Sequence, residues 1–104
     1  MKYRFNGFTE KANNAMNLAI SSAEELGHDY VGSEHVMLGL LKEGTGVAYT
    51  VLNKLGVTAE AYEKLIRERI GTGEPTALST EEFTPRTKRI LQVAAVAGDR
   101  KSVV

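Results

Sequence analysis

Histidine and cysteine, the side chains most often used for acid–base catalysis near neutral pH and for zinc binding, are few in this chain. It has two histidines, His28 and His35, and no cysteine. Glu34 and His35 are adjacent, but no second histidine stands at the spacing by which zinc hydrolases place two ligands on one helix face. The phosphate-binding loop of ATPases is also missing from the sequence. We therefore predict no catalysis, no metal ion and no cofactor, with His35 packed and His28 bonded to the carbonyls that end a helix.

Glu34 is the residue that we single out for binding. Ser33 is a good helix N-cap, so Glu34 would stand in the first turn, where a carboxylate interacts favourably with the helix dipole by about 0.3–1 kcal/mol. A second interpretation is that the carboxylate accepts both N–H groups of a guanidinium. The pattern of residues alone favours the structural role.

Two threonines stand at predicted helix starts, Thr9 and Thr84, and both are typical N-caps. A helix start is also a place where free N–H groups and the positive end of the dipole attract anions. Lys11 and Lys88 follow within the first turns. Each lysine is therefore either a solvated side chain or a cation able to neutralise a bound phosphate.

The elements that position these residues are predicted to be helices. Apolar residues recur at steps of three and four through most of the chain, and no segment shows the alternation of a strand. Residues 71–82 lack this period and predict a linker. We expect an all-α fold, with Tyr62, Leu65, Ile66 and Ile70 facing the core. The predicted helices are at about 9–26, from 33 to about 44, 45–55, from 58 to 70, and from 84 onward.

Length and composition predict one globular domain. The chain has 104 residues, of which 42% are hydrophobic and 25% charged. Its 13 basic and 13 acidic residues give a formal net charge of zero. A nucleic-acid binder depends on a basic surface, so this balance argues against one. No apolar run has the length of a membrane span or a signal peptide, and we expect a soluble, cytoplasmic protein.

The chain also carries an internal similarity. Aligning Phe8-Thr9 with Phe83-Thr84 brings Met16 onto Leu91. This match predicts a duplicated helical unit, although two amphipathic helix starts can also match by chance. We expect one domain over 1–104, divided into repeat one at about 8–70, a linker at 71–82, and a truncated start of repeat two at 83–104. Such a truncation predicts an exposed apolar face and a possible dimer.

Two segments resemble a known family. FTEKANNAMNLAISSAEELGHDYVGSEHVMLGLLKEGTGVAYTVLNKLGV closely resembles the first repeat of the Clp N-terminal domain family, and FTPRTKRIL resembles the opening of its second repeat. The similarity covers about 8–97 and is most like the ClpC form. It implies the family's helical repeat fold, here one four-helix repeat plus the first helix of a second, pseudo-symmetric repeat.

The resemblance also implies a function. Clp N-domains of this type sit on the hexameric ring of an AAA+ unfoldase that feeds the ClpP protease, and they bind substrates or adaptor proteins such as MecA. Some bind phosphoarginine, a degradation mark on proteins. Glu34 aligns with the family's glutamate that contacts phosphoarginine. Thr9, Thr84, Lys11 and Lys88 are then candidates for its phosphate.

Other functions remain open at this stage. The domain would also fit adaptor binding alone, or a structural or oligomerisation role without phosphoarginine binding. A small helical nucleic-acid binder is a further alternative, and a strongly salt-dependent affinity for DNA would support it.

Overall fold

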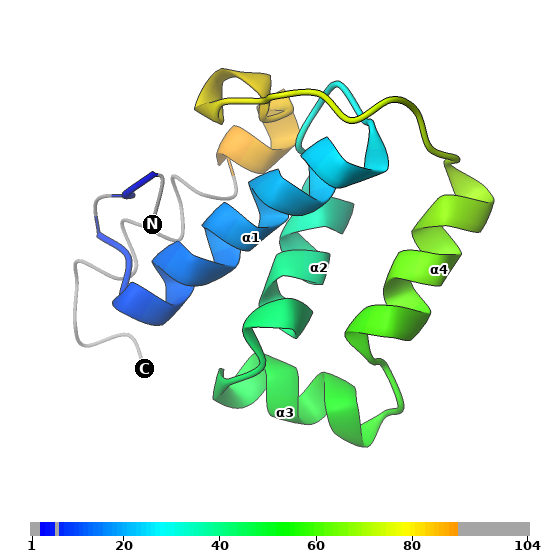
Figure 1. Cartoon of the computed structure of the whole chain (residues 1–104). Coiled ribbons are helices and arrows are strands. Elements are labelled where there is room, and N and C mark those ends of the chain that lie inside the picture. Colours follow the sequence, from blue (N-terminus) through cyan, green and yellow to red (C-terminus); the bar gives the residue numbers. More distant parts are fainter. Residues whose placement is uncertain (1–2, 6, 90–104) are drawn as a thin grey trace.

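The computed structural model describes residues 3–5 and 7–89 (Figure 1). A helical turn at 85–89 follows the last named helix. Within these residues the only β-type pairing is an isolated parallel bridge between Val31 and Phe83. The predicted all-α fold is confirmed. The named helices are α1 (Glu10–Leu26), α2 (Ser33–Glu43), α3 (Gly46–Lys54), α4 (Ala59–Arg69) and the short 3-10 helix η1 (Thr80–Glu82).

Local capping explains where the helices begin and end. The Thr9 hydroxyl accepts a hydrogen bond from the Ala12 N–H at 3.1 Å, and α1 ends at Gly27 in the left-handed conformation, with φ of 75°. Thr58 caps α4 in the same way by accepting from the Ala61 N–H. The two threonine N-caps and the glycine C-cap are the capping residues that helices generally prefer. The predicted bounds of α1 and the predicted start of α4 are confirmed.

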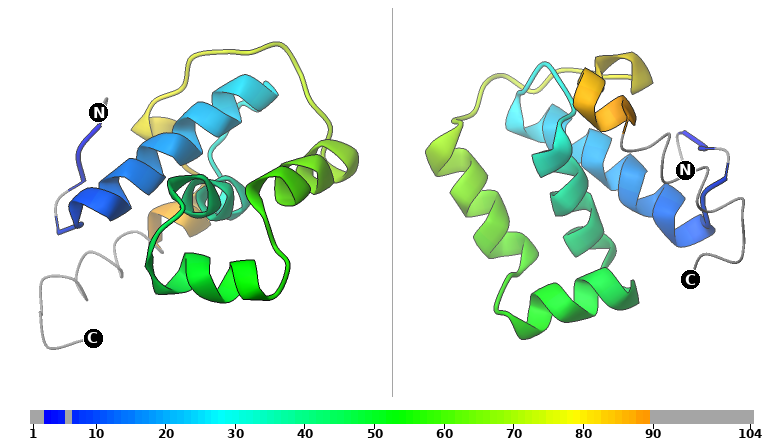
Figure 2. Two further views of the ribbon diagram at one scale, coloured as in Figure 1. Left: turned by 60° about the horizontal axis from the view of Figure 1, so that its bottom comes forward. Right: turned by 180° about the vertical axis from the view of Figure 1, so that it is seen from behind.

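The α2 helix lies between α1 and α4, and α3 crosses the ends of α2 and α4 (Figures 1 and 2). Gly39 allows α1 and α2 to approach closely. A Cβ atom there would overlap the Ala15 carbonyl oxygen and lie 2.9 Å from the Ala19 nitrogen. The glycine is therefore required by the packing of the two helices and not by its own backbone conformation.

Two groups of apolar side chains form the core. The α4 helix contributes little to them, because it packs mainly on α2 and only Ile66 is buried. The prediction that Leu65 and Ile70 face the core is wrong, since these side chains are 44% and 47% exposed. The larger group is Met16, Ala19, Ile20, Ala23, Val31, Leu78 and Phe83; the smaller is Leu26, Leu38 and Ile66.

The predicted linker contains no α-helix but is attached along the end of α1. The Gly73 N–H donates to the Leu26 carbonyl at 2.9 Å, and the Leu78 N–H donates to the Glu24 carboxylate at 2.7 Å. Gly27 and Gly73 are in contact, and a Cβ at Gly27 would overlap the Gly73 backbone. The linker thus carries the chain back across α1 to Phe83.

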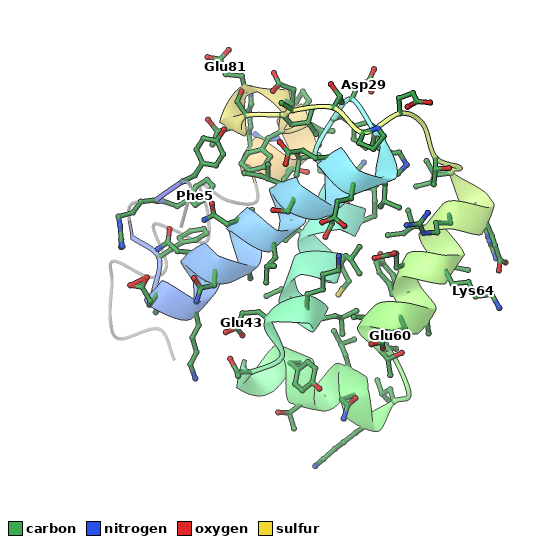
Figure 3. The ribbon with its side chains drawn as sticks, viewed as in Figure 1. Phe5, Asp29, Glu43, Glu60, Lys64 and Glu81 are labelled. Atoms are coloured by element: carbon green, nitrogen blue, oxygen red, sulfur yellow. The ribbon has the colours of Figure 1, made fainter. Side chains whose placement is uncertain are left out.

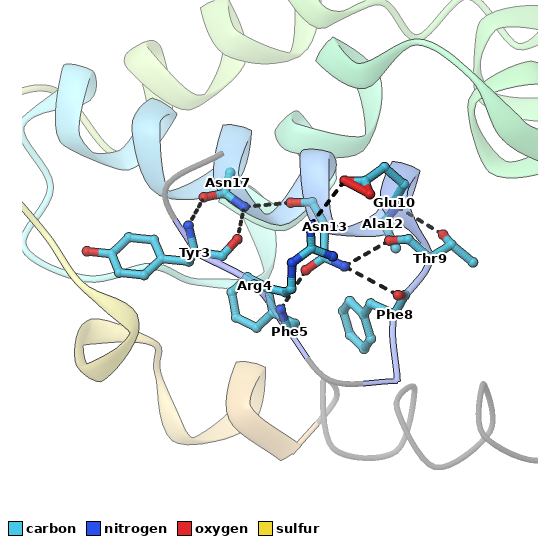
Figure 4. A network of polar contacts seen from close by, with 9 residues as sticks. All are labelled: Tyr3, Arg4, Phe5, Phe8, Thr9, Glu10, Ala12, Asn13 and Asn17. Atoms are coloured by element: carbon cyan, nitrogen blue, oxygen red, sulfur yellow. Dashed lines mark hydrogen bonds and ion pairs between the residues drawn. The ribbon is translucent and has the colours of Figure 1, made fainter.

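The N-terminal segment is held by two asparagines on α1 (Figure 4). Asn17 both accepts from the Tyr3 N–H and donates to the Tyr3 carbonyl, each at 2.7 Å. Asn13, buried one turn earlier, accepts from the Phe5 N–H at 2.5 Å. These amides replace the backbone partners that an extended segment would find in a sheet.

Some predictions fall outside what the structure describes. Residues 90–104, which include most of the predicted second-repeat segment, lie outside the described residues. The repeat boundaries and the dimer stay predictions. None of the described helices is both long and apolar enough to cross a membrane.

Replacing Gly39 with alanine tests the helix contact. In an exposed helix this change stabilises by about 1 kcal/mol through helix propensity. Here the added methyl group must push α1 away, so we expect the free energy of unfolding to fall by about 1–3 kcal/mol, measured in urea. An unchanged or more stable variant would show that α1 and α2 are not in close contact.

Candidate functional site

The candidate site lies where the start of α2 meets the chain after the linker. The Val31 N–H donates to the Glu82 carbonyl at 2.8 Å, and the Thr84 N–H donates to the Val31 carbonyl at 3.1 Å. Val31 directly precedes Gly32, the N-cap of α2. The turn at 85–89 consequently lies beside the first turn of α2, as the right view of Figure 2 shows. Thr84, which the family resemblance pairs with Glu34 for one ligand, is thus bonded to the residue three before Glu34.

Thr84 begins this turn as predicted. Its hydroxyl oxygen accepts from the Thr87 N–H at 3.2 Å and is 2.8 Å from the Thr87 hydroxyl. Thr87 is buried, whereas Lys88 is exposed. The cap therefore anchors the turn through Thr87 and leaves Lys88 at the surface.

The turn is strongly basic. Residues 85–89 read PRTKR, with three cations and no acid. Arg86 and Arg89, like Lys88, are exposed. We singled out Lys88 alone from the sequence, although the run of cations was the signal that points to all three. The basic turn is thus attached to the chain three residues before the half-buried Glu34, an arrangement suited to a ligand that carries both charges.

The α2 helix begins differently from the prediction. Its N-cap is Gly32, and Ser33 is the first helical residue, so the expected Ser33 cap is wrong. The reason is that the ring of His35 does the capping: its Nδ1 accepts the Gly32 N–H at 2.9 Å. His35 stands at the third helical position, where a Glu or Gln side chain usually reaches back in this way.

His35 and His28 form a buried hydrogen-bonded pair. Because His35 Nδ1 accepts from Gly32, its Nε2 carries the proton and donates to His28 Nδ1 at 2.7 Å. His28 Nε2 then carries a proton and donates to the Gly71 carbonyl at 2.8 Å. The expectation that His35 is packed is confirmed, whereas His28 bonds the end of the α4 region instead of the carbonyls of α1. Both rings are neutral in this arrangement.

Burial lowers the pKa of His35 to about 4, because an imidazolium would lose its solvation there. The negative charge of Glu34 acts in the opposite direction and the nearby His28 in the same direction, but burial has the largest effect. The ring of His35 is 0% exposed. It therefore serves as a neutral structural group. Its Nε2 proton is used in the hydrogen bond to His28, and the ring does not act as an acid at neutral pH.

Tyr30 completes the surroundings of Glu34. Its hydroxyl donates to Glu34 Oε2 at 2.8 Å. Its ring stacks on His28, with centroids 5.7 Å apart and planes 5° from parallel, and meets the edge of His35. Burial, followed by the bond to Glu34, raises the pKa of Tyr30 to about 12. Sequence reasoning missed Tyr30, although its place four residues before Glu34 was visible.

Thr9 and Lys11 lie elsewhere. They stand at the first turn of α1, whose 17 residues span about 25 Å, whereas the loop to α2 leaves from the other end. Figure 4 shows Thr9 beside Phe8 and Ala12, at the N-terminal segment. The structure does not bring Thr9 or Lys11 together with Glu34. Glu60, at the start of α4, lies at the opposite end of the fold from the loop that carries Asp29 and leads into α2 (Figure 3).

Comparison with known proteins gives the family. The family described as "Clp repeat (R) N-terminal domain" matches residues 7–101. The chain belongs to the Clp N-terminal domain family. Relatives include the chloroplastic chaperone protein ClpC1 of Arabidopsis thaliana, 39% identical over 90% of this chain, and the negative regulator of genetic competence ClpC/MecB of Bacillus subtilis (strain 168), 38% identical over 86%.

This Clp N-domain corresponds to a small part of those relatives. The matched segment is 10% of the Arabidopsis protein and 11% of the Bacillus protein. A ClpA homolog of Guillardia theta is 41% identical over 86% of this chain and is likewise matched over 11% of its length. The chain is thus similar to the N-terminal regulatory module of AAA+ ATPases of the ClpC and ClpA type.

The neutral histidine pair predicts a specific pH dependence. The pKa of His35 is about 4 when folded and about 6.5 when unfolded, so the unfolded chain binds a proton in this range that the folded chain does not. The contribution of His35 to the free energy of unfolding is therefore full above pH 6.5 and falls as the pH drops toward 4. Between pH 7 and pH 5 we expect a loss of about 2 kcal/mol from this residue, measured by urea unfolding.

The control is His35→Gln. A glutamine at this position offers an oxygen to the Gly32 N–H and an N–H to His28, but it does not titrate. Its loss of stability between pH 7 and pH 5 should be smaller than that of the unaltered chain by about 2 kcal/mol. Equal losses in the two proteins would contradict a neutral, buried His35.

Proposed function

We propose that this domain recognises substrate proteins and adaptors for a ClpC-like ATP-dependent unfoldase, and that it binds proteins marked by phosphoarginine. The observation that carries the proposal is the backbone bond from Thr84 to Val31, which attaches the basic turn three residues before Glu34. The domain itself performs no catalysis in this proposal. ATP hydrolysis, and proteolysis by ClpP, would belong to the rest of a full-length protein.

The ligand's chemistry fits the two sides of the site. Phosphoarginine carries a planar guanidinium with N–H donors and a phosphoryl group with negative oxygens. The Glu34 carboxylate would accept the guanidinium N–H groups in a charge-assisted pair. The phosphoryl group would lie at the turn that begins with Thr84, where Lys88 supplies positive charge. Arg86 and Arg89 add to the positive potential there.

Glu34 is open to a cation from such a ligand. Among the residues that the structure describes, the ion pairs join Arg4 with Glu10 and Glu63 with Lys42 and Arg67, and none includes Glu34. Its hydrogen-bond partner is the uncharged Tyr30 hydroxyl. A cation from outside the domain would therefore not have to displace an internal one.

Thr9 and Lys11 remain proposed contacts for an anionic group, at a place separate from Glu34. Their place at the start of α1 makes them candidates for a second anionic group, distant from Glu34. We also propose an adaptor of the MecA type as a partner and the cytoplasm as the location. The Bacillus relative is named a negative regulator of genetic competence, which is said of that protein alone.

Calorimetric titration with free phosphoarginine tests the proposal. We expect selective binding, at least tenfold tighter than that of arginine, because arginine lacks the group that the basic turn attracts. Glu34→Gln keeps the shape of the side chain but removes its charge. We expect this variant to bind about 10- to 100-fold more weakly, the cost of one charge-assisted hydrogen bond to a partly buried group.

Glu60→Gln is the matched control. Glu60 holds in α4 the place that Glu34 holds in α2, the second position of the helix, so both changes remove the same dipole interaction. Glu60 is exposed at the end of α4 that lies beside α3, away from the turn at 85–89 (Figure 1), and its variant should bind like the unaltered domain. Equal losses in both variants, or no binding by the unaltered domain, would overturn phosphoarginine recognition and favour an adaptor-only or structural role.

A further inference from the structure

Glu34 is held by two neighbours that sequence reasoning did not assign to binding. We propose that Tyr30 is a positioning residue for the Glu34 carboxylate and that Gly32 provides the space in which this carboxylate lies. The inference rests on the proposed function, because it concerns how the same site presents its acid. It assigns two further residues to the guanidinium side of the site.

The Tyr30 hydroxyl fixes one oxygen of Glu34. It donates to Oε2 at 2.8 Å from the loop that precedes α2. A half-buried glutamate has several accessible rotamers. A ligand that binds both of its oxygens would otherwise lose binding free energy to the entropy cost of ordering the side chain. The bond with Tyr30 orders the carboxylate beforehand. Oε1 and the second lone pair of Oε2 stay available to a guanidinium.

The ring of Tyr30 is itself fixed by the histidine pair. It lies parallel to His28 and meets His35 at 65°, with centroids 5.1 Å apart. Since both histidines are locked into single tautomers by Gly32 and Gly71, the ring has a rigid support. The raised pKa of Tyr30, about 12, means that the hydroxyl keeps its proton, and so stays a donor, at neutral pH.

Gly32 is required for space and not for its backbone angle. Its φ of −102° is open to any residue. A Cβ at Gly32, however, would overlap Glu34 Oε1 and lie 3.0 Å from Glu34 Cδ and 3.1 Å from the Tyr30 ring. The overlapping atoms are the mobile end of Glu34. An alanine would therefore displace the carboxylate, and its approach to the Tyr30 ring would require an adjustment of only a few tenths of an ångström there.

Two substitutions test the inference, Tyr30→Phe and Gly32→Ala. Tyr30→Phe removes the hydroxyl and keeps the stacked ring. We expect each variant to bind phosphoarginine about three- to tenfold more weakly, as fits the loss of one hydrogen bond that orders a charged group. Affinity for inorganic phosphate, which does not use Glu34, should stay unchanged. Tyr49→Phe in α3 is the control and should change neither affinity.

The possible outcomes distinguish a positioning role of Tyr30 and Gly32 from a structural role, and from a failure of the proposed function. A merely structural effect of Tyr30→Phe would lower the affinity for both ligands together with the melting temperature, and this would overturn positioning. Wild-type affinity for phosphoarginine in both variants would also overturn it while leaving the proposed function standing. If the unaltered domain binds inorganic phosphate but shows no preference for phosphoarginine, the proposed function fails and this inference fails with it.

Discussion

The hydrogen bond between His28 and His35 decides where three parts of the chain meet. A neutral imidazole has one donor and one acceptor, so the Gly32 N–H at one end and the Gly71 carbonyl at the other leave a single arrangement of protons. The start of α2, the loop before it and the end of the α4 region are joined by this chain of bonds. A proton added to either ring would set two N–H groups against each other.

The site also depends on a contact between distant parts of the sequence. The bridge between Val31 and Phe83 brings the basic turn to α2, and it forms because the linker is attached along α1 through Gly73 and Leu78. No period in residues 71–82 indicates this path. From the sequence, Glu34 and Thr84 were separate candidates, and their association with a single ligand came only from family resemblance.

The features that were predictable are those fixed locally. The caps of α1 and α4 need only neighbouring residues, and Thr9 and Thr58 act as expected. The start of α2 was predicted one residue late because a histidine ring, an uncommon capping group, replaces the serine hydroxyl. Burial was harder still: Leu65 has the right period for a core position, but no helix among the described residues covers that side of α4.

The same arrangement explains why Glu34 has no internal cation as a partner among the described residues, although a histidine follows it directly. An exposed, protonated histidine at this position would form an ion pair with the carboxylate. The burial of His35 prevents this, as do the hydrogen bonds that both of its ring nitrogens already make. The side-chain partner of Glu34 is therefore the neutral hydroxyl of Tyr30. A neutral donor orders a carboxylate without cancelling its charge, whereas a lysine or arginine in that place would compete with every incoming cation. The neutral rings of His35 and Tyr30 thus leave the carboxylate of Glu34 without an internal counter-ion.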